Sequence, residues 1–249
     1  MFHLAAYAAA IGSTADTDVT AVVDDILTIQ NSHFVLSQEM MLLSAMAMSA
    51  TLTRAKIASP SMRQIASPFI RPIVIAAIPP ANPNMALFDY SPFRIPPFEE
   101  IQVQASAAPA MTEPFAALLW LASGLDTAPR GNIIPLRFTS TTAAVANTWT
   151  TLTITFADTL PSGVYTMVLS EMSSTNARAH RWIVPNQLYR PGYPSYASVG
   201  SRHPYAISKS QFGMMGSFRS NDLPRPQVLA NGADATHEGY LWVVRTGNL

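Results

Sequence analysis

Residues 163–192, GVYTMVLSEMSSTNARAHRWIVPNQLYRPG, contain the clearest strand pattern in this chain. A Leu-Pro-Ser-Gly turn precedes Val164, and Pro185 ends the apolar run that follows. From Val164 to Glu171 the two alternating faces are each half apolar. This is expected of a strand that is covered on both sides, either within the fold or by a neighbouring subunit. The stretch predicts a β-hairpin that ends in a proline-capped loop.

The second strand of this stretch and the loop after it are rich in arginine and aromatic residues. Arginine pairs and stacks through a planar group, and tyrosine offers a large contact area at a low entropy cost, so both are favoured at protein interfaces. An ordinary surface loop with buried tyrosine anchors is the alternative. The residues that we predict to contact a partner subunit are Arg178, His180, Trp182, Tyr189, Arg190, Tyr193 and Tyr196.

The low charge of the chain also favours protein contact. The 249 residues carry 15 Lys plus Arg and 15 Asp plus Glu, so the formal net charge is zero and 12% of the residues are charged. The usual share is about twice as large. Lys56 and Lys209 are the only lysines, and lysine is depleted at interfaces where arginine is enriched. Codon bias is the alternative explanation of the arginine excess. The balanced charge gives no strong sign of direct nucleic-acid binding.

Proline usage divides the chain. Residues 1–59 contain no proline, whereas all 20 prolines lie from Pro60 to Pro226. Residues 60–98 alternate prolines with short apolar runs, and we expect one strand there at residues 70–78. The predicted segments are a helical N-terminal arm at residues 1–59, a proline-rich extended connector at 60–98 and a β-sandwich at 99–249.

The prediction of an α-helical arm rests on spacing and caps. Asp16 and Asp18 stand where helix N-caps are favoured, before valines at helical spacing. The apolar run that begins at Met40 goes most of the way round a helix and ends at Arg54 and Lys56, where the helix dipole favours cations. The run is too short to span a bilayer, so we predict no transmembrane segment. Contact of these helices with a membrane is compatible with their composition.

From residue 99 onward, apolar or alternating runs follow one another between Pro, Gly and Asn turns. Ile101 and Val103 alternate with glutamines, as in a half-buried strand. Six to eight short strands without helical spacing between them indicate an antiparallel sandwich. The runs are residues 99–107, 115–123, 133–141, 148–158, 163–172, 177–185 and 239–246.

Residues 163–192, together with GSFRSNDLPRPQVLANG at 216–232 and GYLWVVR at 239–245, resemble the jelly-roll coat proteins of small tailless icosahedral viruses. The resemblance covers about residues 99–249 and rests on strand rhythm and loop style. It implies a mainly β chain with a single antiparallel jelly-roll β-sandwich of eight strands. It also implies a capsid protein of the virion, which tiles a shell with copies of itself and with other capsid proteins. A double jelly roll would need more strands than these runs supply.

One feature departs from many coat proteins, whose genome-binding arms are strongly basic. Residues 1–53 contain no Lys or Arg and carry five carboxylates. We therefore expect the arm to contact protein or lipid rather than nucleic acid.

The sequence shows no pattern of a catalytic or metal site, so we predict no enzyme and no cofactor. The absence of cysteine excludes thiolate ligands and cysteine nucleophiles, and the five histidines lack metal-site spacing. Asp234 and His237 can approach each other, but no serine stands in a nucleophile elbow beside them. A calcium ion in the turn at residues 220–224 is compatible with its oxygen atoms.

The alternative function is a non-enzymatic binding module, such as a carbohydrate- or receptor-binding sandwich or a minor virion or spike protein. In that interpretation Trp182, Tyr193 and Tyr196 are exposed aromatic contacts.

Overall fold

The stretch at residues 163–192 folds into two strands that do not pair with each other. In the computed structural model, β16 (Val164–Ser173) and β17 (Ala177–Ile183) lie in two different sheets. The predicted hairpin is therefore wrong, although both strands lie where the sequence pattern indicates. The half-apolar faces of β16 are covered because the chain crosses here from one sheet of a sandwich to the facing one.

The structure describes residues 2–49, 52–65, 71–76, 86–87, 92–108, 112–124, 127, 129–196 and 214–248. The chain divides into an N-terminal unit, Ala5–Ser123, and a C-terminal unit, which consists of Gly124–Leu249 together with Met1–Leu4. The predicted segments 1–59, 60–98 and 99–249 do not coincide with these units.

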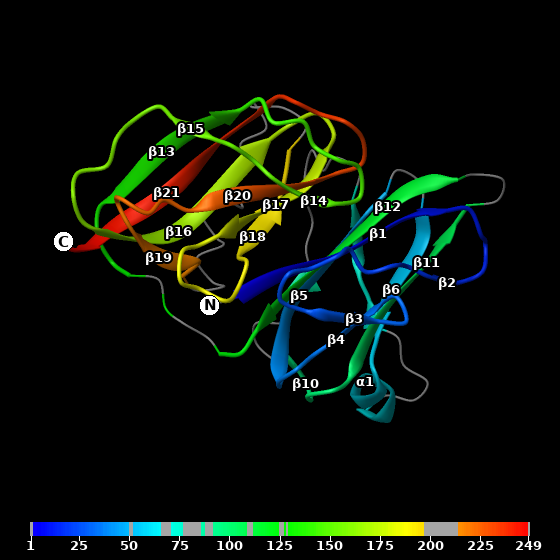
Figure 1. Ribbon diagram of the computed structural model, residues 1–249. Coiled ribbons are helices and arrows are strands. Elements are labelled where there is room, and N and C mark those ends of the chain that lie inside the picture. Colours follow the sequence, from blue (N-terminus) through cyan, green and yellow to red (C-terminus); the bar gives the residue numbers. More distant parts are fainter. Residues whose placement is uncertain are drawn as a thin grey trace. The chain divides into compact units, whose positions relative to one another are not determined.

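The C-terminal unit contains two sheets. Figure 1 shows their strands, which begin along the chain with the green β13 and end with the red β21. Apart from the short β15, its described strands form one sheet in the order β13-β21-β16-β19 and a second in the order β14-β20-β17-β18. Counted along the chain, these are the first, eighth, third and sixth strands, and the second, seventh, fourth and fifth. The remaining bounds are β13 (Ile133–Ser140), β14 (Trp149–Thr151), β15 (Thr155–Phe156), β18 (Gly192–Pro194), β19 (Gly216–Arg219), β20 (Arg225–Ala230) and β21 (His237–Gly247).

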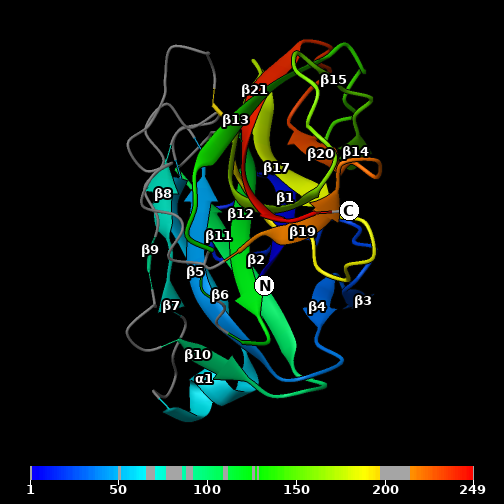
Figure 2. The same cartoon turned by 90° about the vertical axis from the view of Figure 1, so that its left-hand side faces the viewer.

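The N-terminal unit repeats this strand order. One sheet runs β1-β12-β5-β10 and the other contains β4-β11-β6-β7, as Figure 2 shows for their long strands. Among the described residues of this unit, short strands and one helix, α1, are added at the edges, with α1 beside β10 in both views. The bounds are β1 (Phe2–Ile11), β2 (Thr17–Asp18), β3 (Thr28–Gln30), β4 (His33–Val35), β5 (Met40–Met48), β6 (Leu52–Ala58), α1 (Pro60–Ile65), β7 (Arg71–Pro72), β8 (Val74–Ala76), β9 (Ala86–Leu87), β10 (Phe93–Ile95), β11 (Glu100–Ala107) and β12 (Glu113–Ala122).

Each unit is thus a jelly roll, because in each the eight principal strands are wound into two facing sheets in the same order. The chain is mainly β with antiparallel sheets, but the prediction of a single jelly roll in residues 99–249 is corrected. Strands β11 and β12, which the sequence assigned to that sandwich, belong to the N-terminal unit. The other principal strands of that unit are β1, β4, β5 and β6 in residues 1–59 and β7 and β10 in residues 60–98.

The predicted N-terminal α-helical arm is wrong, since the described part of residues 1–59 forms strands β1 to β6. The run at Met40–Met48 is apolar on every side, and this pattern fits a strand buried on both faces as well as it fits a buried helix. Arg54 and Lys56 do not cap a helix. Both donate to the carboxylate of Asp16, Arg54 Nη2 at 2.7 Å. Desolvation raises the pKa of Asp16, but the hydrogen bonds and positive charges of Lys56 and Arg54 outweigh it and leave the pKa below its ordinary value.

The predicted connector at residues 60–98 contributes α1 and β7 to β10 to the N-terminal unit. Of the strand expected at residues 70–78, positions 71–76 contain β7 and β8, while residues 70, 77 and 78 lie outside the described residues. The extended, proline-rich sequence forms short strands here. Short strands at the edge of a sheet tolerate proline, because a proline cannot donate a hydrogen bond to a neighbouring strand.

Tyr7 ties the two sheets of the N-terminal unit together. It lies on β1, its ring packs edge-on against Phe34 of β4 in the facing sheet at 5.0 Å between centroids, and its hydroxyl donates to the carbonyl of Ile101. The same hydroxyl accepts from the N–H of Phe34 at 3.2 Å, so it bridges two paired strands. Burial raises the pKa of Tyr7, which keeps this bridge protonated.

Replacing Tyr7 by Phe should lower the free energy of unfolding of the N-terminal unit by about 2 kcal/mol, because two buried backbone groups lose a hydrogen-bond partner. Tyr165→Phe in the C-terminal unit is the matched control. Its buried hydroxyl donates at 2.8 Å to the carbonyl of the exposed Pro161, which water can reach in the variant, so we expect a loss within about 0.5 kcal/mol. Urea unfolding, followed by tryptophan fluorescence, measures both. Equal losses of unfolding free energy in the two variants would contradict the role of the Tyr7 hydroxyl as a bridge between β4 and β11.

Candidate interaction surfaces

The seven residues predicted to contact a partner lie in the C-terminal unit, on β17, on β18 and in the segments that flank β18. Six of them are buried within the single chain, and Arg190 is half-buried. The exposed fractions of Arg178, His180 and Trp182 are 1%, 0% and 0%. In the isolated chain these side chains therefore stabilise the sandwich, and their contact with another subunit stays a prediction.

His180 and Trp182 join the two sheets of the C-terminal unit. The ring of His180 lies between two hydroxyls, with Nε2 at 2.9 Å from Ser170 Oγ on β16 and Nδ1 at 3.2 Å from Ser195 Oγ. The Trp182 ring meets Phe138 of β13 edge-on at 5.4 Å between centroids. Both contacts cross from one sheet to the other, so this face of β17 is the core face.

Two arginines of β17 are buried as well, which the sequence did not indicate. Arg178 Nη1 donates to Asn147 Oδ1 at 2.9 Å, and burial lowers the pKa of Arg178 to about 10, so it remains charged at neutral pH. Arg181 Nε donates to Gln227 Oε1 at 2.7 Å, and its guanidinium lies 4.3 Å from the centre of the Trp149 ring. The arginine excess thus has a partly internal cause, because such pairs hold the sheet from inside.

The loop between β17 and β18 is covered by the beginning of the chain. The N–H of Leu4 donates to the carbonyl of Arg190 at 2.8 Å, and the N–H of Arg190 donates to His3 Nδ1 at 3.2 Å. The rings of Phe2 and Tyr193 lie 5.8 Å apart. The apolar N-terminal residues are therefore part of the C-terminal sandwich.

A core position for Trp182 predicts a large loss on truncation. Trp182→Ala should lower the free energy of unfolding of the C-terminal unit by about 3–5 kcal/mol, the usual range for a buried tryptophan. Leu188→Ala, in the next loop and 61% exposed, is the control and should change it by about 0.5 kcal/mol or less. Urea unfolding of the unassembled chain decides the matter. A Trp182→Ala chain of unchanged stability would show that Trp182 does not support the core.

Asp234, which the sequence placed within reach of His237, joins the loops at one end of the C-terminal unit. Its carboxylate accepts hydrogen bonds from Ser174 Oγ and from the N–H groups of Asn176 at 2.9 Å and Thr236 at 3.2 Å. His237 donates through Nε2 to a backbone carbonyl at 3.0 Å. Partial burial raises the pKa of Asp234, but the hydrogen bonds outweigh it and the pKa lies below its ordinary value. The carboxylate ties the crossing between β16 and β17 to the turn after β20.

This lowered pKa predicts a loss of stability in acid. A carboxylate with a depressed folded-state pKa stabilises the fold above its unfolded pKa, which is about 3.9, and the effect is lost as the pH falls through the folded-state value. Asp234→Asn should therefore flatten the fall in stability below about pH 4. Asp158→Asn, at an exposed position of the same unit, is the control. Urea unfolding at a series of pH values measures the slope, and an unchanged slope in Asp234→Asn would refute this role.

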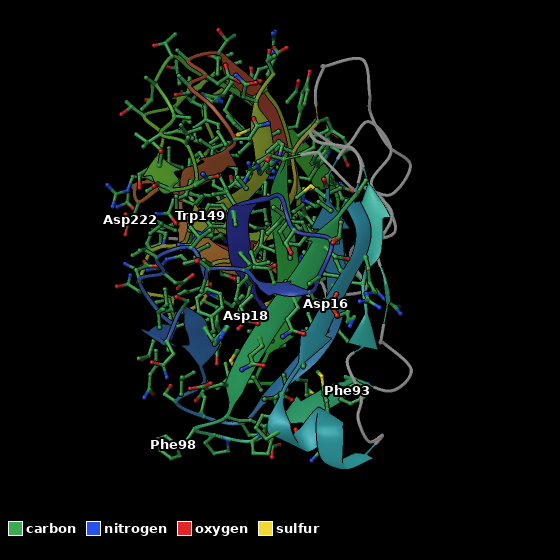
Figure 3. All side chains as sticks on the ribbon, turned by 90° about the vertical axis from the view of Figure 1, so that its right-hand side faces the viewer. Asp16, Asp18, Phe93, Phe98, Trp149 and Asp222 are labelled. Atoms are coloured by element: carbon green, nitrogen blue, oxygen red, sulfur yellow. The ribbon has the colours of Figure 1, made fainter. Side chains whose placement is uncertain are left out.

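The described surface carries six exposed large apolar side chains, spread over both units: Val23, Phe98, Ile133, Val145, Leu188 and Leu223. Phe98 is the most exposed, at 82%. Figure 3 shows it at the turn before β11, projecting outside the sheets. These side chains lie on loops and strand ends, which are the parts of a sandwich that vary without changing its core.

Two hollows of contrasting chemistry open on the C-terminal unit. One of about 600 Å³ has a mixed lining, with Asn186, Gln187, Arg219, Asn221 and Asp222 beside the apolar Val164, Pro185 and Phe218. An apolar one of about 260 Å³ is lined by Leu152, Ile154, Phe156, Leu223 and Pro224, with Thr151, Thr153 and Arg225 at its edge.

Among the described residues, no three His, Asp or Glu side chains gather closely enough to hold a metal ion. Within the same residues, no helix has both the length and the apolar character needed to cross a membrane.

Comparison with known proteins shows similarity to a solved structure but to no family model. No protein-family model matches the chain, and no curated protein matches its sequence. Among solved structures, the chain is similar to the major capsid protein P2 of bacteriophage PM2, with 8% sequence identity and a TM-score of 0.25. The alignment covers 99% of this chain and 98% of that one. The assignment of two jelly rolls rests on the strand order of this chain itself.

Proposed function

We propose that this chain is a structural capsid subunit, which assembles with copies of itself and with other capsid proteins into the shell of a virion and carries out no catalysis. The observation that carries the proposal is the repetition of one jelly-roll strand order in two consecutive units of a single weakly charged chain. The jelly roll is a frequent fold of viral shells and is also found in lectins and cupins. The fold alone therefore does not decide the function.

Composition supports assembly over the other uses of this fold. Only 12% of the residues are charged, and 13 of the 15 basic residues are arginine, since 15 less the two lysines leaves 13. A surface of this kind loses little hydration on meeting protein, and buried apolar area contributes about 25 cal/mol per Å². Exposed apolar side chains on both units offer such area.

The N-terminal unit favours protein over nucleic acid as a partner. Residues 1–53 contain no Lys or Arg, and the basic Arg54 and Lys56 are paired with Asp16. Binding to a phosphate backbone depends on unpaired cations gathered on one surface.

A binding module is the second candidate, and the hollow of mixed lining in the C-terminal unit favours it. Planar amides, a guanidinium and a carboxylate line about 600 Å³ there, a set of groups that suits a polyhydroxylated ligand. The aromatic residues first considered for this role, Trp182, Tyr193 and Tyr196, are buried inside the unit. A carbohydrate would therefore bind through amides and charges rather than through stacked rings.

The purified full-length chain should form large closed particles or defined rings as its concentration rises. Light scattering at several protein and salt concentrations measures the mass, and electron microscopy shows the symmetry. A persistent monomer of 26.9 kDa under all conditions would refute self-assembly. Binding of that monomer to a glycan panel, abolished by Asp222→Ala, would then establish the second candidate.

A further inference from the structure

Phe98 adopts a backbone conformation that aromatic residues avoid. It follows Pro96 and Pro97 in the turn between β10 and β11, and its φ angle is +63°. The other non-glycine residues with positive φ in the described part of the chain are three asparagines and a serine. A bulky residue in this region is strained, and such strain persists only where the surrounding structure imposes it. The Phe98 side chain is 82% exposed, so packing of the ring within its own chain does not offset the strain.

Hydrogen bonds from two neighbouring segments impose this conformation. The N–H of Phe98 donates to the carbonyl of Leu36 at 2.7 Å, and the N–H of Leu36 donates to the carbonyl of Glu99 at 3.4 Å. The Glu99 carboxylate accepts from the N–H and the hydroxyl of Ser61 in α1, at 2.6 and 2.8 Å. The turn is fixed on both sides, and the ring is presented to solvent with little freedom to lose on binding.

The apolar hollow of the C-terminal unit has the chemistry that such a ring requires. Leu152, Ile154, Phe156 and Pro224 line it, and Leu223 stands at its mouth, 40% exposed. Arg225 is exposed at the edge, where a guanidinium can stack on an aromatic face. The charges also match, because Glu99 and Glu100 flank Phe98 while the hollow is flanked by Arg225.

We infer that Phe98 of one copy inserts into this hollow on a second copy of the chain. The inference rests on the proposed self-assembly and names the contact that drives it. Phe98 and the hollow are different surfaces of one chain, so the contact is heterologous. Each copy then offers a free ring and a free hollow, and repetition generates a closed ring or a continuous lattice. An aromatic residue at the centre of a small pocket is the usual form of an interface hot spot.

Cysteine pairing tests this contact directly, because the chain has no cysteine of its own. Phe98→Cys and Leu223→Cys chains are mixed, assembled and oxidised, then analysed by denaturing gel without reductant. We expect a covalent dimer that contains one chain of each kind. Phe98→Cys mixed with Val145→Cys is the control, since Val145 is exposed on the same unit as Leu223 but does not line the hollow. Equal dimer yields in the two mixtures would overturn the inference.

A second variant separates assembly from folding. Phe98→Gly relieves the backbone strain, so its thermal midpoint should equal or exceed that of the wild type, while assembly should need about a tenfold higher protein concentration. Val23→Ala, which trims another exposed apolar side chain of the N-terminal unit, should change neither quantity. If the wild type assembles and Phe98→Gly assembles at the same protein concentration, the Phe98 contact is refuted but the proposed function is not. A wild-type chain that never assembles would refute both the contact and the proposed function.

Discussion

Both units depend on the same physical constraint, which is that two β-sheets must be held face to face around a shared interior. In the C-terminal unit His180, in the middle of β17, holds the two sheets together. One of its ring nitrogens is hydrogen-bonded to Ser170 of the opposite sheet and the other to Ser195. In the N-terminal unit Tyr7 crosses the interior in the same sense and reaches the backbone of two paired strands. Each group is polar, fully buried and hydrogen-bonded, so it restricts the sandwich to the one packing in which its partners are met.

This constraint explains why the arginine and aromatic residues of β17 lie inside. A strand in the interior of a sheet, with its outer face also covered, has no side that faces water. Arg181 accordingly finds Gln227 and the Trp149 ring, and the first residues of the chain cover the adjoining loop. Residue types that are common at interfaces here perform the same pairing and stacking within one chain. Their chemistry is that of an interface, but the surfaces they join are two sheets.

With the sandwich interiors closed in this way, the groups left for contact with other molecules are on the loops and turns. Phe98 is the clearest case, because the turn that carries it is strained and firmly anchored while the ring itself contacts solvent. In the assembly that we propose, a few such side chains would make the contacts between copies without any change in the fold. Because few residues are charged, such contacts remove few charged groups from water, and the desolvation penalty is small.

The sequence by itself determined the β character of residues 99–249 and the positions of individual strands, since alternation such as Ile101 and Val103 against glutamines is a local property. It did not determine that Met40–Met48 is a strand, because a run that is apolar on every side has no period to distinguish strand from helix. Nor did it show that β16 and β17 separate, that Arg178 and Arg181 are buried, or that residues 1–59 build half of a second jelly roll. Those features were decided only in the tertiary structure, because strand pairing and burial join residues far apart in the chain, and their free energy exists only when both partners are in place.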